Sequence, residues 1–141
     1  MSEPILLLDT HVWLWLALGQ KGTLSPRAIR EIDEAAKRAA LRVSIISVWE
    51  IAQLESRRRI ALPLSLNDWM AGALNCPGIR LLALENPVTI MDSCRLPGDF
   101  HADPADCFLV ATARAENAVL VTRDKKILDY GKAGHVRVMK V

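Results

Sequence analysis

The chain has 141 residues, of which 51% are hydrophobic, and a formal net charge of +2. This length suits one domain with a substantial core, and no apolar run approaches the roughly 20 residues that a membrane span requires. The near-neutral charge excludes a chain that binds nucleic acid through overall charge alone. Residues 1–4 lack the basic start of a signal peptide, so we expect a cytoplasmic protein.

Short apolar runs and helical patterns alternate along the whole chain. In chain order, the pattern predicts a strand over 5–8, helices over 10–18 and 26–39, a strand over 41–46, a helix from Ser47, a helix after Ser65, a strand over 79–84, helices over 87–95 and from Pro104, a strand over 118–121, a short helix to Tyr130 and an edge strand over 136–138. Such alternation implies a mostly parallel sheet covered on both faces. We therefore expect a single α/β domain over residues 1–141.

Small polar residues mark the expected helix starts. Ser25 precedes a proline at the first helical position, which is a typical start signal. Thr10 and Ser47 are the expected N-caps of the helices that follow the first two strands. Ser65, with Asp68 three residues later, predicts a capping box in its Asp form.

Five carboxylates fall at the predicted ends of strands or starts of helices: Asp9, Glu50, Asp103, Asp106 and Asp124. In open α/β sheets, ligands bind outside the carboxyl ends of the strands. We therefore expect the five side chains on one rim of the sheet.

Each acid also has a structural interpretation. Asp9, Asp103 and Asp124 could be N-caps, and Glu50 could favour the N-terminus of its helix electrostatically. The group is harder to explain this way, because Asp9 and Glu50 have strongly apolar neighbours and no matching set of Lys or Arg neutralises the acids. Carboxylates held near a core need a partner.

A divalent cation is the most economical partner for these acids. Oxygen-only ligands suit Mg²⁺ or Mn²⁺. Such an ion polarises a phosphodiester and lowers the pKa of a bound water. The spacing of the acids therefore predicts metal-assisted hydrolysis of a phosphoryl bond.

Four segments in order resemble the PIN-domain family, and within it the VapC-type toxins of toxin–antitoxin operons: residues 6–11 (LLLDTH), 47–51 (SVWEI), 101–106 (HADPAD) and 121–124 (VTRD). The resemblance covers essentially the whole chain. It implies a three-layer α/β/α fold and an endoribonuclease that depends on Mg²⁺ or Mn²⁺ and cleaves RNA by metal-activated water. It also implies a homodimer, neutralised by a cognate antitoxin whose C-terminal segment enters the active-site groove.

The resemblance assigns roles to the acids. Asp9, Glu50 and Asp106 match the first three family acids, and Asp124 matches the fourth. Asp103 belongs to the same Asp-Pro-Ala-Asp stretch as Asp106. It either binds the metal, directly or through water, or only caps a helix.

Residues beside the acids receive secondary roles from the resemblance. Thr10 and Thr122 match hydroxyl positions that support the acids. Cys107 stands where the family commonly has an arginine, a change that affects phosphate contacts rather than metal ligands. His11 and His101 could act as general bases, although water activated by a metal needs no histidine.

Several basic residues are candidate contacts to RNA phosphates: Arg57, Arg58, Arg59, Arg123 and Lys125. We expect Trp49 and Trp69 to belong to the core or to a groove wall rather than to stack on bases.

The leading hypothesis is a toxin ribonuclease. Its alternatives are a PIN-type RNA-processing nuclease that is not a toxin, and a catalytically silent interaction module. A phosphatase with Asp9 as its nucleophile is a further possibility. That class usually has a second acid two residues later, where this chain has His11.

Overall fold

The computed structural model describes residues 3–141. Its strands are β1 (Leu6–Leu8), β2 (Leu41–Ser44), β3 (Ile79–Leu82), β4 (Val119–Thr122) and β5 (Arg137–Lys140). Its α-helices are α1 (Thr10–Ala17), α2 (Pro26–Lys37), α3 (Ile45–Ser56), α4 (Leu66–Leu74), α5 (Pro87–Ser93), α6 (Pro104–Ala115) and α7 (Lys125–Lys132). A short 3₁₀ turn (Lys21–Thr23) precedes α2.

The strands form one sheet in the order β3-β2-β1-β4-β5. Every pairing is parallel, and Leu6 of the central strand pairs with Leu41 on one side and Val119 on the other. All three leucines of β1 are buried, as expected for a central strand covered on both faces. The sheet is thus wholly parallel, where the sequence predicted a mostly parallel one.

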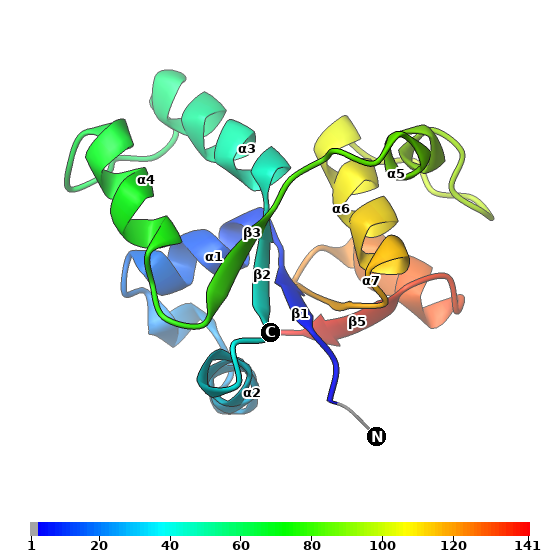
Figure 1. The fold of residues 1–141 in the computed structure, drawn as a ribbon, viewed down its shortest axis with the longest axis horizontal. Coiled ribbons are helices and arrows are strands. Elements are labelled where there is room, and N and C mark those ends of the chain that lie inside the picture. Colours follow the sequence, from blue (N-terminus) through cyan, green and yellow to red (C-terminus); the bar gives the residue numbers. More distant parts are fainter. Residues whose placement is uncertain (1–2) are drawn as a thin grey trace.

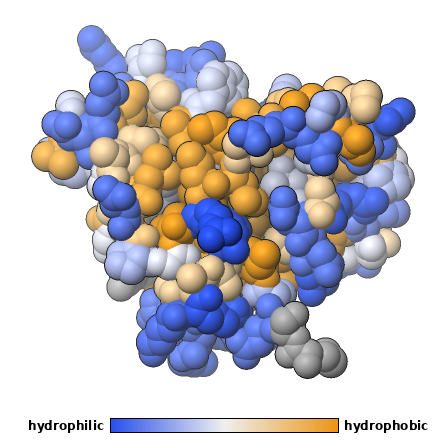
Figure 2. All heavy atoms as spheres, viewed as in Figure 1, coloured by the Kyte–Doolittle hydropathy of each residue, from blue (hydrophilic) through white to orange (hydrophobic). Residues whose placement is uncertain are grey.

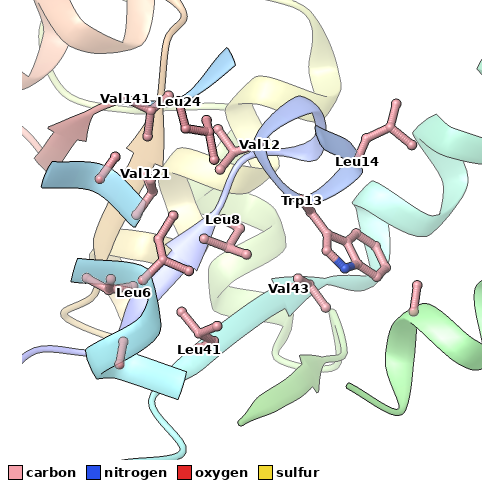
Figure 3. Close-up of a cluster of buried hydrophobic side chains, with 14 of the residues drawn as sticks. Leu6, Leu8, Val12, Trp13, Leu14, Leu24, Leu41, Val43, Val121 and Val141 are labelled. Atoms are coloured by element: carbon pink, nitrogen blue, oxygen red, sulfur yellow. The ribbon is translucent and has the colours of Figure 1, made fainter. Parts of the chain in front are cut away.

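Two hydrophobic clusters lie on opposite faces of the sheet. Leu6 and Leu8 belong to one cluster and Leu7 to the other, because successive side chains of a strand point to opposite faces. Helices α1, α2 and α4 cover the first face, and α6 and α7 cover the second (Figure 1). Figure 3 shows the first cluster, where the Trp13 indole extends from α1 into the core. The three-layer α/β/α fold is confirmed.

Two expected N-caps are wrong, and the corrections concern the acids. Asp9, not Thr10, caps α1, since its carboxylate accepts the amide N–H of Thr10. Helix α3 is capped by Ser44 rather than Ser47, because β2 ends earlier than its apolar run suggests. Glu50 therefore lies in the second turn of α3, where attraction to the helix N-terminus does not explain it.

Most other boundaries agree with the sequence within two residues. Ser25 and Ser65 cap α2 and α4 as predicted, by accepting the amide N–H groups of Ala28 and Asp68. Strand β3 stops at Leu82, two residues before its apolar run ends. Within residues 3–141, no helix is both long and apolar enough to cross a membrane.

Candidate active site

Asp9 occupies the carboxyl end of the central strand, where β1 turns into α1. Its Oδ1 accepts the Thr10 amide at 2.7 Å, and its Oδ2 accepts the Thr122 hydroxyl at 2.6 Å. These bonds fix the carboxylate plane and favour its charged form. Burial nevertheless raises the pKa of Asp9, since desolvation outweighs the two hydrogen bonds.

Thr10 links α1 to α3. Its Oγ1 donates to Glu50 Oε1 at 2.5 Å and lies 2.8 Å from the Ser47 Oγ. The hydroxyl is available for this role because Asp9 has taken over the capping of α1. Burial also raises the pKa of Glu50, and the charge of Asp9 adds to that rise.

Thr122 links the end of β4 to Asp124. Its Oγ1 accepts the Asp124 amide at 3.0 Å while its proton goes to Asp9. Asp124 caps α7 through Oδ1, which accepts the Ile127 amide at 3.1 Å. The structural interpretation of Asp124 is therefore correct, and the residue still lines the acidic pocket described below.

The two acids of α6 differ in their surroundings. Asp103 holds the N-cap position, but its side chain makes no capping hydrogen bond. The carboxylate of Asp103 is thus free for another ligand. Asp106 is half-buried in the first turn of α6, and its pKa is raised to about 7. Desolvation is the largest cause, followed by the negative charges of Asp9, Asp124, Glu50 and Asp103.

The five acids line one pocket of about 240 Å³, which we call the acidic pocket. The sequence prediction of a common rim is therefore correct. Across residues 3–141, however, no three His, Cys, Asp or Glu side chains converge into a ready-made metal site. An oxygen-rich pocket of this kind suits Mg²⁺, because Mg²⁺ retains several waters and needs only one or two direct carboxylate bonds.

Arg123 also lines the acidic pocket. Its guanidinium carbon lies 4.8 Å from the ring centroid of Trp15, a cation–π distance. This contact holds a positive charge beside the acids without pairing it to one of them. Lys125, in contrast, is exposed at the start of α7 and is not part of the pocket lining.

A second hollow of about 460 Å³, which we call the groove, shares His11, Glu50 and Asp103 with the acidic pocket. Arg57 and Arg59 line the groove, whereas Arg58 does not. The reason is local: α3 ends at Ser56 with Arg57 as its C-cap, and Arg58 adopts a left-handed φ of 55°. This turn, closed by the Arg59 amide on the Leu54 carbonyl, directs alternate arginines to different sides.

Trp49 and Trp69 occupy opposite environments. Trp69 is in the core, 6% exposed, whereas Trp49 is 53% exposed and lines the groove. Ser47 and Ile51 are the fully buried residues of α3. Trp49, two positions from each, is rotated from them by about 200° around the helix.

His101 lies apart from the acids. It is exposed and pairs with Asp99 at 2.6 Å, outside both hollows. His11 borders both of them. Cys107 occupies the position where the family resemblance predicts an arginine. Its sulfur contacts the Ala102 carbonyl. The arginine that lines the acidic pocket is Arg123.

Comparison with known proteins agrees with this geometry. The family model described as PIN domain matches residues 6–133. The chain belongs to the PIN-domain family. It is 31% identical over 121 residues to Ribonuclease VapC22 of Mycobacterium tuberculosis, covering 86% of this chain and 88% of that protein. VapC nucleases with PIN domains are metal-dependent in general, which fits the oxygen donors gathered here.

Solved structures share the fold of this PIN domain. The Rickettsia felis VapBC2 complex bound to a promoter DNA fragment matches with a TM-score of 0.68 and 14% identity, covering 96% of this chain and 98% of that one. FitAcB from Neisseria gonorrhoeae matches with a TM-score of 0.58 and 19% identity, covering 96% of each chain. At these identities the similarity establishes the architecture alone.

Proposed function

We propose that the protein is a Mg²⁺-dependent endoribonuclease, the toxin of a toxin–antitoxin pair. The observation that carries the proposal is the acidic pocket, in which five carboxylates meet, and in which burial, followed by the charges of the other four acids, raises the pKa of Asp106 to about 7. Buried like charges are costly unless a cation offsets them. The relationship to Ribonuclease VapC22 supports RNA as the substrate.

The oxygen donors of the acidic pocket support a set of metal ligands. We propose that Asp9, Glu50 and Asp106 hold Mg²⁺, or Mn²⁺ in its place, and that Asp103 contributes directly or through water. Asp124 completes the site. When bound, the ion supplies Lewis-acid activation of water and charge stabilisation at the phosphodiester.

The hydrogen bonds already present support this assignment. The Thr122 hydroxyl and Thr10 amide orient Asp9, and the Thr10 hydroxyl orients Glu50, as partners of metal ligands commonly do. Arg123, held over Trp15, is placed to contact a phosphate oxygen that enters the acidic pocket. Lys125, Arg57 and Arg59 are the further proposed RNA contacts, whereas Arg58, expected from the sequence to be another, does not line the groove and is left out of the proposal.

We also propose two protein partners, an antitoxin and a second copy of the chain. The solved relatives include VapBC and FitAB complexes, which supports an antitoxin as a partner. We propose that its C-terminal segment enters the active site, where the acidic pocket favours a basic segment. Hydrophobic atoms gather on one face of the molecule over the region of β3 and the chain leading to α5 (Figure 2). The exposed Leu81, Val88 and Met91 of these elements support a homodimer surface there. RNA as substrate supports a cytoplasmic location.

The proposed activity is tested by cleavage of single-stranded RNA by the purified chain with Mg²⁺, with EDTA as the metal-free control. Asp9→Asn should lower kcat more than about 100-fold, beyond the effect usual for residues that only support a metal ligand. Asp33→Asn, an exposed acid on α2, should leave kcat unchanged. Cleavage that persists in EDTA or in Asp9→Asn contradicts the proposal.

A further inference from the structure

Trp49 is a large aromatic side chain in the middle of a helix that does not use it for the core. It is 53% exposed, whereas Ile51 of the same helix is fully buried. It lines the groove next to Glu50, which also faces the acidic pocket. An exposed indole in a concave, charged surface is typical of a binding site.

The residues that follow Trp49 on α3 continue its face. Gln53 and Arg57 lie four and eight positions later, and all three line the groove. Positions i, i+4 and i+8 share one side of a helix and span about 12 Å. The groove therefore presents an aromatic ring, then an amide, then a positive charge, with Arg59 adding a second charge at the far end.

The groove is continuous with the acidic pocket. His11, Glu50 and Asp103 border both, so a strand whose phosphodiester lies among the acids has its neighbouring nucleotide at the groove. Trp49 lies at the near end of this path, beside Glu50, and Arg57 lies at the far end. The order matches a polynucleotide, in which bases and phosphates alternate along the strand.

We propose that the groove is a nucleotide-binding subsite for the RNA strand. The Trp49 indole stacks on the base next to the scissile phosphodiester, and Arg57 and Arg59 neutralise the phosphates beyond it. Aromatic side chains and a positively charged groove are the usual elements of single-strand binding, and stacking tolerates any base. This inference rests on the ribonuclease function proposed above.

The groove carries the acids Glu50 and Asp103 at the end that it shares with the acidic pocket, and Arg57 and Arg59 at its far end. The positive charge of the far end favours RNA over a protein segment. A segment that neutralises the acidic pocket is basic, and its continuation into the groove would meet Arg57 and Arg59. An RNA strand instead meets positive charge at its phosphates and an aromatic surface at its base. Gln53 lies between the two, with an amide that both donates and accepts hydrogen bonds.

The test separates binding from cleavage by measuring affinity in the Asp9→Asn background. The probes are a labelled single-stranded RNA of mixed sequence and a sugar-phosphate strand of equal length without bases. Trp49→Ala should weaken binding of the RNA about tenfold, as expected for loss of one stacked base, and leave binding of the base-free strand unchanged. Trp49→Phe should restore most of the affinity for RNA. Leu64→Ala, which removes another exposed apolar side chain outside the groove, is the matched control.

Two results would overturn the subsite. Equal weakening on both probes means that Trp49 does not stack on a base. Unchanged affinity for both means that the strand takes another path and that the groove serves a different ligand, such as a protein segment. Neither result touches the proposed activity, since cleavage by the unmodified chain and its loss in Asp9→Asn are measured separately.

Discussion

The acidic pocket and the groove meet along α3 but differ in their charge. The acidic pocket gathers five carboxylates, whereas the groove sets two of them, Glu50 and Asp103, against Trp49, Arg57 and Arg59. Glu50 and Trp49 are adjacent in sequence, and Glu50 lines both hollows, whereas Trp49 lines the groove and not the acidic pocket. In the proposed function, α3 thereby supplies both a metal ligand, Glu50, and a strand-binding residue, Trp49. Changes in the two regions should therefore affect different steps.

Among changes that keep every proposed metal ligand, the largest effect is expected from Thr122→Val. The fully buried Thr122 hydroxyl orients Asp9, and loss of such a partner lowers metal affinity or activity about 10- to 100-fold. The effect is measured by following the cleavage rate as a function of Mg²⁺ concentration. RNA affinity is measured in parallel and should not change.

Thr112→Val is the matched control for this substitution. Thr112 is also buried, and its hydroxyl donates to the Phe108 carbonyl within α6. Equal losses of activity in the two variants would show that Thr122 acts through general stability rather than through Asp9.

An intermediate effect, on stability, is expected from Asp106→Asn. The folded pKa of about 7 exceeds the ordinary value of 3.8, so the folded state retains a proton that the unfolded state has lost. The metal-free protein should therefore lose stability as pH rises from about 4 to 7. Asparagine removes this dependence and should make the metal-free protein more stable at pH 8, by roughly 1–2 kcal/mol after allowance for the partial exposure of the group.

Urea unfolding in EDTA at a series of pH values measures this difference. The advantage of Asp106→Asn should vanish below pH 4, and Mg²⁺ should reduce it at pH 8 by binding only the charged form. A variant that is less stable than the unmodified protein at pH 8 would contradict a raised pKa of Asp106 in the folded state.

The smallest effect concerns the groove alone. Arg57→Ala should reduce the slope of RNA affinity against salt concentration by about 0.7, the value for one phosphate contact to a single strand. Arg58→Ala, the adjacent arginine that faces away from the groove, should leave the slope unchanged. Equal changes in both variants would mean that the arginine run acts through its overall charge and that the left-handed turn at Arg58 has no part in binding.

Much of the fold was predictable because its signals are local. The leucine run that ends at Asp9 indicates a buried parallel strand, and Ser25 before a proline indicates a helix start. The common rim of the acids followed from one rule of topology, that the strands of a parallel sheet end on the same edge.

The failures arose where a short apolar run fits more than one structure. Ile45 and Ile46 were predicted to end a strand, but they are the first residues of α3. The prediction was wrong because a run of a few apolar residues is too short to show a helical or a strand period. This shift moved the N-cap from Ser47 to Ser44 and left Glu50 in the second turn.

The sequence by itself determined the α/β class, the parallel sheet and the acids at its edge. Strand periodicity, capping residues and charge are local properties that can be identified in short stretches of consecutive residues. Only the tertiary structure decided how those acids are held and what adjoins them. Thr10 supports Glu50 rather than capping α1, and Trp49 faces the groove with Arg57. Such contacts join residues far apart in the chain or depend on the rotation of a helix, and both are set by packing in three dimensions.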